Sequence, residues 1–245
     1  GTVEAFAAVR SDGKVITWGS LPEGDTSTVK DQLQQVRKIV ASRQAFAAIL
    51  ETGGVVAWGV EFLGGDVRVP YAETVHKLQN VKDIRAAAWA FAALLGNGTV
   101  VAWGNPGMGG DYLEVQDQLT DVCSVHATST AFAALKTDGS VVTWGHGVHG
   151  GDSSSVQGQL IKVVDISSTD RAFAAILSDG SVVTWGDSDY GADSRQVQHQ
   201  LRNVKQLQGT DRAFCAILGD GSVVTWGIAM FGGDCSSVQE QLKRL

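Results

Sequence analysis

The stretch Arg171-Ala-Phe-Ala-Ala-Ile-Leu-Ser-Asp-Gly-Ser-Val-Val-Thr-Trp-Gly186 decides the fold of this chain. Two apolar runs of strand length flank Asp179-Gly180, and an Asp-Gly pair supplies the positive φ angles that a tight hairpin turn needs. The stretch is therefore predicted to form a β-hairpin. It recurs, lightly edited, from one end of the chain to the other.

A Trp-Gly pair closes each copy of the hairpin. Six such pairs follow one another at intervals of 40 or 41 residues, with a single interval of 45. Their tryptophans are Trp18, Trp58, Trp103, Trp144, Trp185 and Trp226. A fixed period of this size indicates a repeat architecture with one small β unit per copy. The repeats span approximately 1–44, 45–89, 90–130, 131–171, 172–212 and 213–245, and we expect them to form a single domain.

Two further segments complete each copy. A polar segment such as Ser154-Ser155-Val156-Gln157-Gly158-Gln159-Leu160 follows the Trp-Gly pair and a Gly-Asp. This Val-Gln-x-Gln-Leu pattern is compatible with one helical turn or with an outer edge strand. A run such as 203–210 then predicts another strand. Repeat two has a longer connection over 67–71, where Pro70 excludes a central position in a β-ladder.

The hairpin also indicates how the repeats pack. Its strands lack a clean alternation of apolar and polar residues, so we expect each small sheet to be covered on both faces. A Phe or Trp of one unit would sit against alanines of its neighbour, which contributes roughly 4–6 kcal/mol of gross hydrophobic gain per contact. The fold class predicted in this way is all-β, a β-propeller of six repeats of about 41 residues.

The ring is expected to close through its termini, because the first repeat is one strand short. Residues 1–4 would then supply the missing strand beside the C-terminal segment at 242–245. The alternatives are an open β-repeat array or a fragment of a longer propeller. Because the chain opens on Gly1 and not on Met, we expect a mature or trimmed N-terminus.

Composition narrows the choice of partners and compartment. The chain has 245 residues, a net charge of −7 and a pI near 5.1, which argues against a nucleic-acid-binding or basic membrane-binding face. No apolar stretch approaches the roughly 18–20 residues of a membrane span, and the first 20 residues lack the pattern of a signal peptide. Cys123, Cys215 and Cys235 are odd in number and far apart, which indicates an intracellular, reducing compartment.

The motif order Ala131-Phe-Ala-Ala-Leu135, Asp138-Gly139 and Trp144-Gly145, followed by Gly-Gly-Asp, resembles the blade repeat of the regulator of chromosome condensation family. The resemblance covers the whole chain. In two respects the chain departs from that family: Phe stands where the family has His, and Gly-Gly-Asp with Gln-rich segments replaces its Gly-Gln-Leu-Gly loop. The family is usually seven-bladed. The resemblance implies a propeller but no single activity, since the family includes an exchange factor for a small GTPase, parts of ubiquitin ligases and a plant ultraviolet-B photoreceptor.

One aspartate recurs at the same place in every repeat. These residues are Asp25, Asp66, Asp111, Asp152, Asp193 and Asp234. They are compatible with a cation site or with capping of the turn that follows each of them. Capping is favoured, because six symmetric positions are too widely spread to share one ion whose ligands lie at roughly 2.3–2.6 Å.

Other patterns that carry chemistry are weak. His146 and His149 with Asp152 are too few ligands for a metal site, and we interpret them as a solvated loop. The chain has no Gly-x-Ser-x-Gly motif for a nucleophilic serine and no pair of carboxylates left unexplained by turns. We therefore expect no catalytic residue, no metal and no cofactor.

The loop after each Trp-Gly pair is where the repeats differ most. The position five residues after each tryptophan holds Glu23, Leu63, Met108, His149, Tyr190 and Phe231. Equivalent positions of successive propeller blades lie on one face, so these six are predicted to form a partner-binding ring. Leu63, Met108, Tyr190 and Phe231 would be the anchors, because aromatic and Met side chains are enriched in interfaces. The alternative is that these side chains tuck onto the edge of their own blade.

The function predicted from this pattern is a non-enzymatic protein-interaction module or a scaffold subunit of a larger assembly. We expect a soluble protein with a protein partner, no nucleic acid and no membrane span. One alternative is a lectin-like propeller with a weak carbohydrate site between each pair of blades. The other, by analogy with the resembled family, is guanine-nucleotide exchange on a small GTPase.

Overall fold

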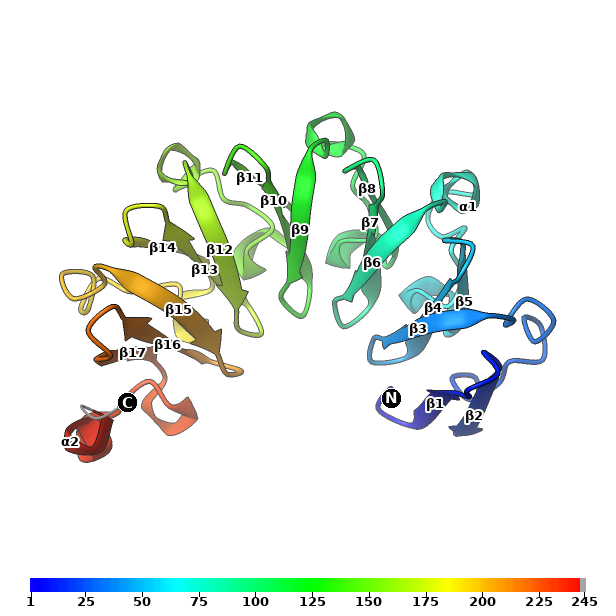
Figure 1. Ribbon diagram of the computed structural model, residues 1–245, viewed down its shortest axis with the longest axis horizontal. Coiled ribbons are helices and arrows are strands. Elements are labelled where there is room, and N and C mark those ends of the chain that lie inside the picture. Colours follow the sequence, from blue (N-terminus) through cyan, green and yellow to red (C-terminus); the bar gives the residue numbers. More distant parts are fainter. Residues whose placement is uncertain (243–245) are drawn as a thin grey trace. The chain divides into compact units, whose positions relative to one another are not determined.

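The computed structural model describes residues 1–242, and its strands follow the six repeats (Figure 1). By contacts the chain forms two compact units, Gly1–Val125 and His126–Leu245. Whether they constitute the single domain expected from the repeats stays a prediction.

Every repeat contains the predicted hairpin. Its first strands are β1 (Ala5–Val9), β4 (Ala45–Leu50), β7 (Ala90–Leu95), β10 (Ala131–Lys136), β13 (Ala172–Leu177) and β16 (Ala213–Leu218). Its second strands are β2 (Val15–Gly19), β5 (Val55–Gly59), β8 (Val100–Gly104), β11 (Val141–Gly145), β14 (Val182–Gly186) and β17 (Val223–Gly227). The register is the same throughout and pairs Phe with Trp, as in Phe173 opposite Trp185.

The hairpins of repeats two to six each gain a third strand, which lies on the other side of the first hairpin strand and is the last strand of the preceding repeat. These strands are β3 (Val36–Ala41), β6 (Val81–Ala86), β9 (Val122–Ala127), β12 (Val163–Ser168) and β15 (Val204–Gly209). The described residues thus form five three-stranded antiparallel sheets, with orders such as β12-β13-β14, and one two-stranded sheet, β1-β2. The predicted strand over 203–210 is confirmed as β15.

The hairpin turns are three-residue turns and not the two-residue turns that an Asp-Gly pair suggests. Leu177 N–H donates to the Ser181 carbonyl at 2.9 Å, and Gly180 N–H donates to the Leu177 carbonyl at 2.8 Å. Only the glycine has a positive φ, 79° at Gly180. The aspartate acts through its side chain, because Asp179 Oδ1 accepts the N–H of Ser181 at 2.9 Å. This arrangement is the type I turn with a left-handed glycine that is common in three-residue hairpins.

The turn glycine also contacts the third strand of the next sheet. Its carbonyl accepts the N–H of the valine that begins the next third strand, as from Val204 to Gly180 at 2.9 Å. The residue before that valine adopts a left-handed conformation in all five repeats, which the sequence analysis did not foresee. These residues are Gln35, Asn80, Asp121, Lys162 and Asn203, with φ between 52° and 58°.

Consecutive repeats pack through the predicted contact of large rings with alanines. Phe214 and Trp226 of repeat six share a buried cluster with Ala172 and Ala174 of repeat five. Within each hairpin the Phe and Trp rings stack with centroids 5.1 to 5.4 Å apart. Trp226 Nε1–H adds a hydrogen bond of 2.9 Å to the Gly191 carbonyl of repeat five, so the indole is fixed at both ends.

The polar Val-Gln-x-Gln-Leu segment is a helical turn and not a strand. It forms 3₁₀ turns at η3 (Gln116–Gln118), η5 (Gln157–Gln159) and η8 (Ser236–Val238), and short helices at α1 (Thr74–Lys77) and α2 (Gln239–Leu242). The first glutamine of the segment caps the outer edge of the sheet. Gln198 Nε2 donates to the Val182 carbonyl of β14 at 2.9 Å, while its Oε1 accepts the Ser194 hydroxyl at 2.7 Å.

The first repeat departs from the pattern. Its Ala5 is buried against Phe46 and Trp58 of repeat two, but Phe6 and Trp18 are 57% and 52% exposed. Coverage of both faces is therefore confirmed for the interior repeats and not for this one. Residues 1–4 form no strand, so they do not supply the missing one. Residues 243–245 of the predicted closure lie outside the described residues, and ring closure stays a prediction.

Candidate binding surface

The six recurring aspartates are turn caps, which confirms the favoured interpretation. In each repeat the carboxylate accepts a hydrogen bond from the backbone N–H of the residue two positions later in the sequence, as from Ser154 to Asp152 at 2.8 Å. The other five bonds, from Ser27, Arg68, Leu113, Arg195 and Ser236, measure between 2.8 and 3.1 Å. At Asp193 a hydrogen bond from the Arg195 guanidinium adds to the one from the Arg195 N–H, and the two lower the pKa of Asp193 to about 2. Within residues 1–242, no group of three or more His, Cys, Asp or Glu is placed to hold a metal ion.

The variable loop forms a 3₁₀ turn in five repeats, and the predicted ring position is always its last residue. The turns are η1 (Glu61–Leu63), η2 (Pro106–Met108), η4 (Gly147–His149), η6 (Ser188–Tyr190) and η7 (Ala229–Phe231). A glycine with φ between 96° and 101° follows each turn. At Gly64, Gly150 and Gly191 the lack of a side chain admits the Phe of the next repeat, since a Cβ on Gly191 would lie 2.8 Å from the Phe214 ring.

A threonine ahead of the hairpin fixes each turn in the second unit. Thr169 Oγ1–H donates to the Tyr190 carbonyl at 2.8 Å, while the same oxygen accepts the N–H of Ala172 at 3.0 Å. Thr128 and Thr210 make the same bonds to the carbonyls of His149 and Phe231 at 3.1 and 2.8 Å. The threonine that follows the third strand thus holds the turn of the candidate surface in place.

Burial separates the six predicted ring residues. Glu23 and Tyr190 are only 2% and 8% exposed, so Glu23 is not available for contact and Tyr190 offers little more than a ring edge. Leu63, Met108, His149 and Phe231 are half-buried. In three of the turns the residue one position earlier is a strongly exposed apolar side chain: Phe62, Val148 and Met230 are 69%, 65% and 85% exposed.

In the second unit, arginines and aromatic rings alternate. The guanidinium of Arg171 lies 4.6 Å from the centre of the Tyr190 ring, and that of Arg212 lies 4.7 Å from the same ring. Arg212 also lies 5.1 Å from the centre of the Phe231 ring. We call Arg171, Tyr190, Arg212 and Phe231 the arginine–aromatic row. Each contact falls within the range of a cation–π interaction.

Two histidines lie in the neighbouring turn. The rings of His146 and His149 stack with centroids 4.1 Å apart, and His149 Nδ1 lies 2.8 Å from the Thr130 hydroxyl. Burial, the His146 ring and the charge of Arg171 lower the pKa of His149. The pair is therefore more ordered than the predicted solvated loop, although Val148 between the two rings remains exposed.

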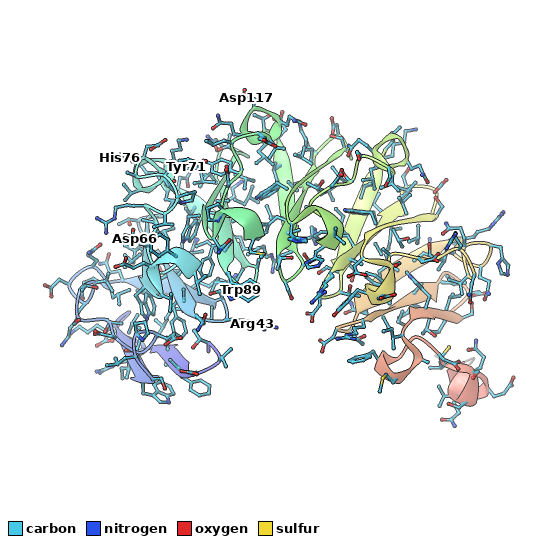
Figure 2. All side chains as sticks on the ribbon, turned by 180° about the vertical axis from the view of Figure 1, so that it is seen from behind. Arg43, Asp66, Tyr71, His76, Trp89 and Asp117 are labelled. Carbon is cyan, nitrogen blue, oxygen red and sulfur yellow. The ribbon has the colours of Figure 1, made fainter. Side chains whose placement is uncertain are left out.

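In the first unit, an arginine two residues before one hairpin pairs with a tryptophan directly before the next hairpin. Arg43 lies over the Trp89 ring with its guanidinium 5.9 Å from the ring centre (Figure 2). The residue just before each hairpin was not among the predicted site residues; it is Trp89, Arg171 or Arg212 in these repeats. A usable signal existed, since this position varies in size and charge while the Ala-Phe after it does not.

Comparison with known proteins agrees with the geometry. Residues 163–192 match the Regulator of chromosome condensation (RCC1) repeat. No curated protein sequence matches the chain. No helix among residues 1–242 is long and apolar enough to cross a membrane.

Several solved structures share the fold. Prp20p of Saccharomyces cerevisiae, whose structure was reported with its binding properties to Gsp1p and histones, is 16% identical, with 94% of this chain and 71% of that chain covered and a TM-score of 0.55. The CRINKLY WD40 ectodomain of the Arabidopsis thaliana receptor kinase ACR4 is 20% identical, with coverages of 91% and 80% and a TM-score of 0.51. Human WBSCR16 is 16% identical, with coverages of 86% and 67% and a TM-score of 0.50. The chain is therefore built from repeats of the regulator of chromosome condensation type, in an all-β fold of six β-propeller repeats.

Proposed function

We propose that this chain is a non-enzymatic protein-interaction module that binds a protein partner through the 3₁₀ turns of its second unit. The observation that carries the proposal is the arginine–aromatic row. Arginine and large aromatic side chains are enriched among the residues that dominate binding energy in protein interfaces.

The row is held in place before any partner arrives. Tyr190 is fixed in the buried cluster between repeats five and six, and the two guanidinium groups lie against its ring. Arg171 is further oriented by Asp187, whose carboxylate lies 3.9 Å from the guanidinium. A preorganised surface loses less side-chain entropy on binding than a mobile one, so more of the contact energy appears as affinity.

Exposed apolar groups extend the row. Met230 lies directly before Phe231 and is 85% exposed, which is unusual for a side chain of this size. Methionine adapts its shape to a partner at low cost. Polar anchors beside an adaptable apolar tip are typical of protein-binding surfaces. The scaffold role in a larger assembly, the lectin-like site and the exchange activity that the resembled family implies remain alternatives, none of them favoured by a comparable feature of this surface.

The test is affinity capture followed by mass spectrometry with matched variants. The wild-type protein and the variants Arg212→Ala and Phe231→Ala are compared with Arg202→Ala. Arg202 is an exposed arginine beside Asn203, which packs on the hairpin turn at Gly180. It thus controls for loss of charge at the opposite end of the sheet.

We expect the same protein to be retained by wild type and Arg202→Ala, and its affinity to fall by about 1–3 kcal/mol in Arg212→Ala and in Phe231→Ala. Melting temperatures of all variants are measured in parallel. If Arg202→Ala and Arg212→Ala both bound like wild type, or both lost binding, the arginine–aromatic row would not be the binding surface.

A further inference from the structure

Strand β17 lies at the edge of its three-stranded sheet. β17 pairs with β16 on one side and with no other described strand on the other. Since Leu218 N–H donates to the Ser222 carbonyl, the alternation of an antiparallel ladder turns the main-chain groups of Val223, Thr225 and Gly227 away from β16. Within the described residues, the Val223 carbonyl accepts a single hydrogen bond, from Gln239 Nε2 at 3.4 Å.

The chain itself shows what can cover such an edge. In repeat two the connection runs from Asp66 to Leu78, four residues longer than Asp193 to Leu201 in repeat five. The extra residues bring the Val69 carbonyl to the last residue of β8, whose Gly104 N–H donates to it at 2.8 Å. Asp66 and Tyr71 on this connection are labelled in Figure 2. Burial and a hydrogen bond to Asp111 raise the pKa of Tyr71.

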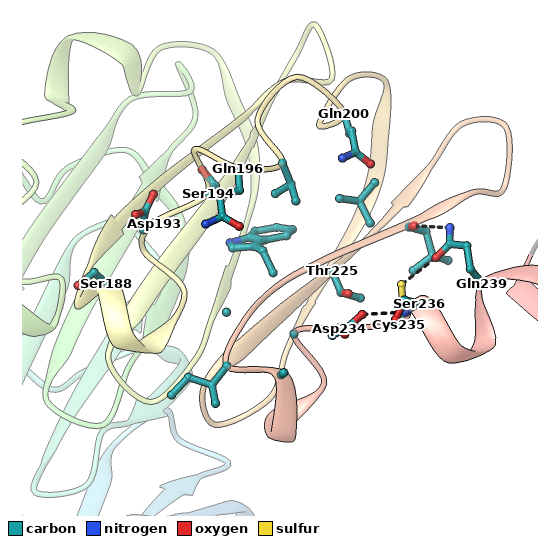
Figure 3. A pocket seen from close by; sticks show the side chains of 18 of the residues that line it. Ser188, Asp193, Ser194, Gln196, Gln200, Thr225, Asp234, Cys235, Ser236 and Gln239 are labelled. Atoms are coloured by element: carbon teal, nitrogen blue, oxygen red, sulfur yellow. Dashed lines mark hydrogen bonds between the residues drawn. The ribbon is translucent and has the colours of Figure 1, made fainter.

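The equivalent edge at β17 borders an open groove. A cavity of about 930 Å³ runs between the polar segment of repeat five and the strand, and it reaches Thr225 and Gly227 (Figure 3). Gly227 occupies the position of Gly104, but repeat five lacks the four extra residues that cover β8. Five residues of strand span roughly 17 Å, which matches a short peptide in extended conformation.

Charge defines the occupant further. Three carboxylates line the groove, those of Asp189, Asp193 and Asp234, and among residues 1–242 no lysine, arginine or histidine does so. Arg195 outside the groove is paired with Asp193 at 2.6 Å, which leaves Asp189 and Asp234 as the uncompensated charges. Basic side chains on the incoming segment would complement this lining.

We propose that the groove along β17 binds a short extended segment of a partner protein that carries lysine or arginine, added as a fourth strand to the sheet. Main-chain hydrogen bonds to Thr225 and Gly227 provide the docking, and alternate basic side chains meet Asp189 and Asp234. This site is separate from the arginine–aromatic row and does not depend on the function proposed for it.

The test is a titration followed by the backbone amide resonances of the full chain. The probe is the acetylated and amidated pentapeptide Val-Lys-Val-Lys-Val. We expect saturable shifts centred on Thr225 and Gly227, and affinity at least about 10-fold weaker for Val-Glu-Val-Glu-Val. A lysine peptide with alternate N-methylated amides should lose binding to a similar extent, because strand addition needs its N–H and carbonyl groups.

Variants of the groove complete the test. The double variant Asp189→Asn/Asp234→Asn keeps the cap at Asp234, since asparagine caps turns as well as aspartate does, and should weaken the lysine peptide about 5-fold. Asp211→Asn, an exposed carboxylate that does not line the groove, is the control and should bind like wild type. The amide spectrum of each variant shows whether it remains folded.

Four results would overturn the proposal. They are equal binding of the lysine and glutamate peptides, undiminished binding of the N-methylated peptide, shifts located outside the groove, and no shift at all at millimolar peptide. Displacement of the lysine peptide by a neutral oligosaccharide that shifts the same amides would instead identify the groove as a carbohydrate site.

Discussion

Removing the glutamine that caps β14 should destabilise the protein measurably. In Gln198→Ala two hydrogen bonds disappear, the 2.9 Å bond to the Val182 carbonyl and the 2.7 Å bond from the Ser194 hydroxyl. A typical hydrogen bond contributes about 0.5–1.5 kcal/mol net, so the two together correspond to about 1–3 kcal/mol. The loss is tempered because Ser194 keeps its contact with Thr184 at 3.1 Å.

Repeat six supplies a matched control. There Cys235 stands in place of the serine, and Gln239 reaches the Val223 carbonyl only at 3.4 Å. Because that bond is long and the thiol is a weak donor, Gln239→Ala should cost less than about 1 kcal/mol. The two variants therefore change the same residue type in the same structural position with different expected losses.

Urea unfolding gives the free-energy change, and hydrogen exchange at β14 and β17 locates it. Exchange is needed because repeat proteins can open locally before they unfold globally. We expect faster exchange near Val182 in Gln198→Ala and little change near Val223 in Gln239→Ala. If both variants lost the same stability, or if Gln198→Ala lost less than about 0.5 kcal/mol, the cap would not stabilise the sheet edge in the way argued.

Three further outcomes are expected. Trp144→Ala, at 4% exposure, should lower the free energy of unfolding by about 3–5 kcal/mol, whereas Trp18→Ala, at 52% exposure, should cost well under half of that in the same urea titration. Lys162→Asn should raise the free energy of unfolding by about 0.5–1 kcal/mol, and with it the melting temperature, because Lys162 has a φ of 58° that asparagine tolerates better. A melting temperature below that of the wild type would contradict this prediction. Because the pKa of His149 is lower in the folded protein than in the unfolded chain, the unfolded chain takes up a proton at this residue more readily as the pH falls below 6.5. The melting temperature should therefore fall as the pH drops below 6.5, and it should fall less steeply in His149→Gln.

The repeats, the hairpins and their packing were predictable because each rests on local chemistry. The pairing of Asp179 with Gly180 marks the turn, and a Phe facing a Trp across the hairpin leaves only alanine-sized space on the neighbour. The polar segment was ambiguous for a physical reason. Its pattern suits a strand as well as a helical turn, and the choice depends on where the side chain of Gln198 finds an acceptor, which only the neighbouring strand determines.

The candidate surface was less predictable. Position five after the tryptophan ends the 3₁₀ turn in five repeats, but its exposure differs from loop to loop: Glu23 and Tyr190 are buried while Phe231 is half-buried. The cation–π contacts of Arg212 join side chains that are 19 and 22 residues apart in sequence, and no local periodicity reports such contacts.

In the first five repeats, the carbonyl of the hairpin-turn glycine links its own hairpin to the third strand of the next sheet. Gly180 needs its φ of 79° for its own turn, and a Cβ there would lie 2.7 Å from the Asn203 Cα at the start of the next third strand. In a nearest-neighbour description of a repeat array, Gly180 therefore contributes to the coupling between repeats and not only to the intrinsic stability of one. A substitution such as Gly180→Ala would reduce the cooperativity of unfolding, so that the neighbouring sheet which contains β15 melts at a lower denaturant concentration even though its own sequence is unchanged.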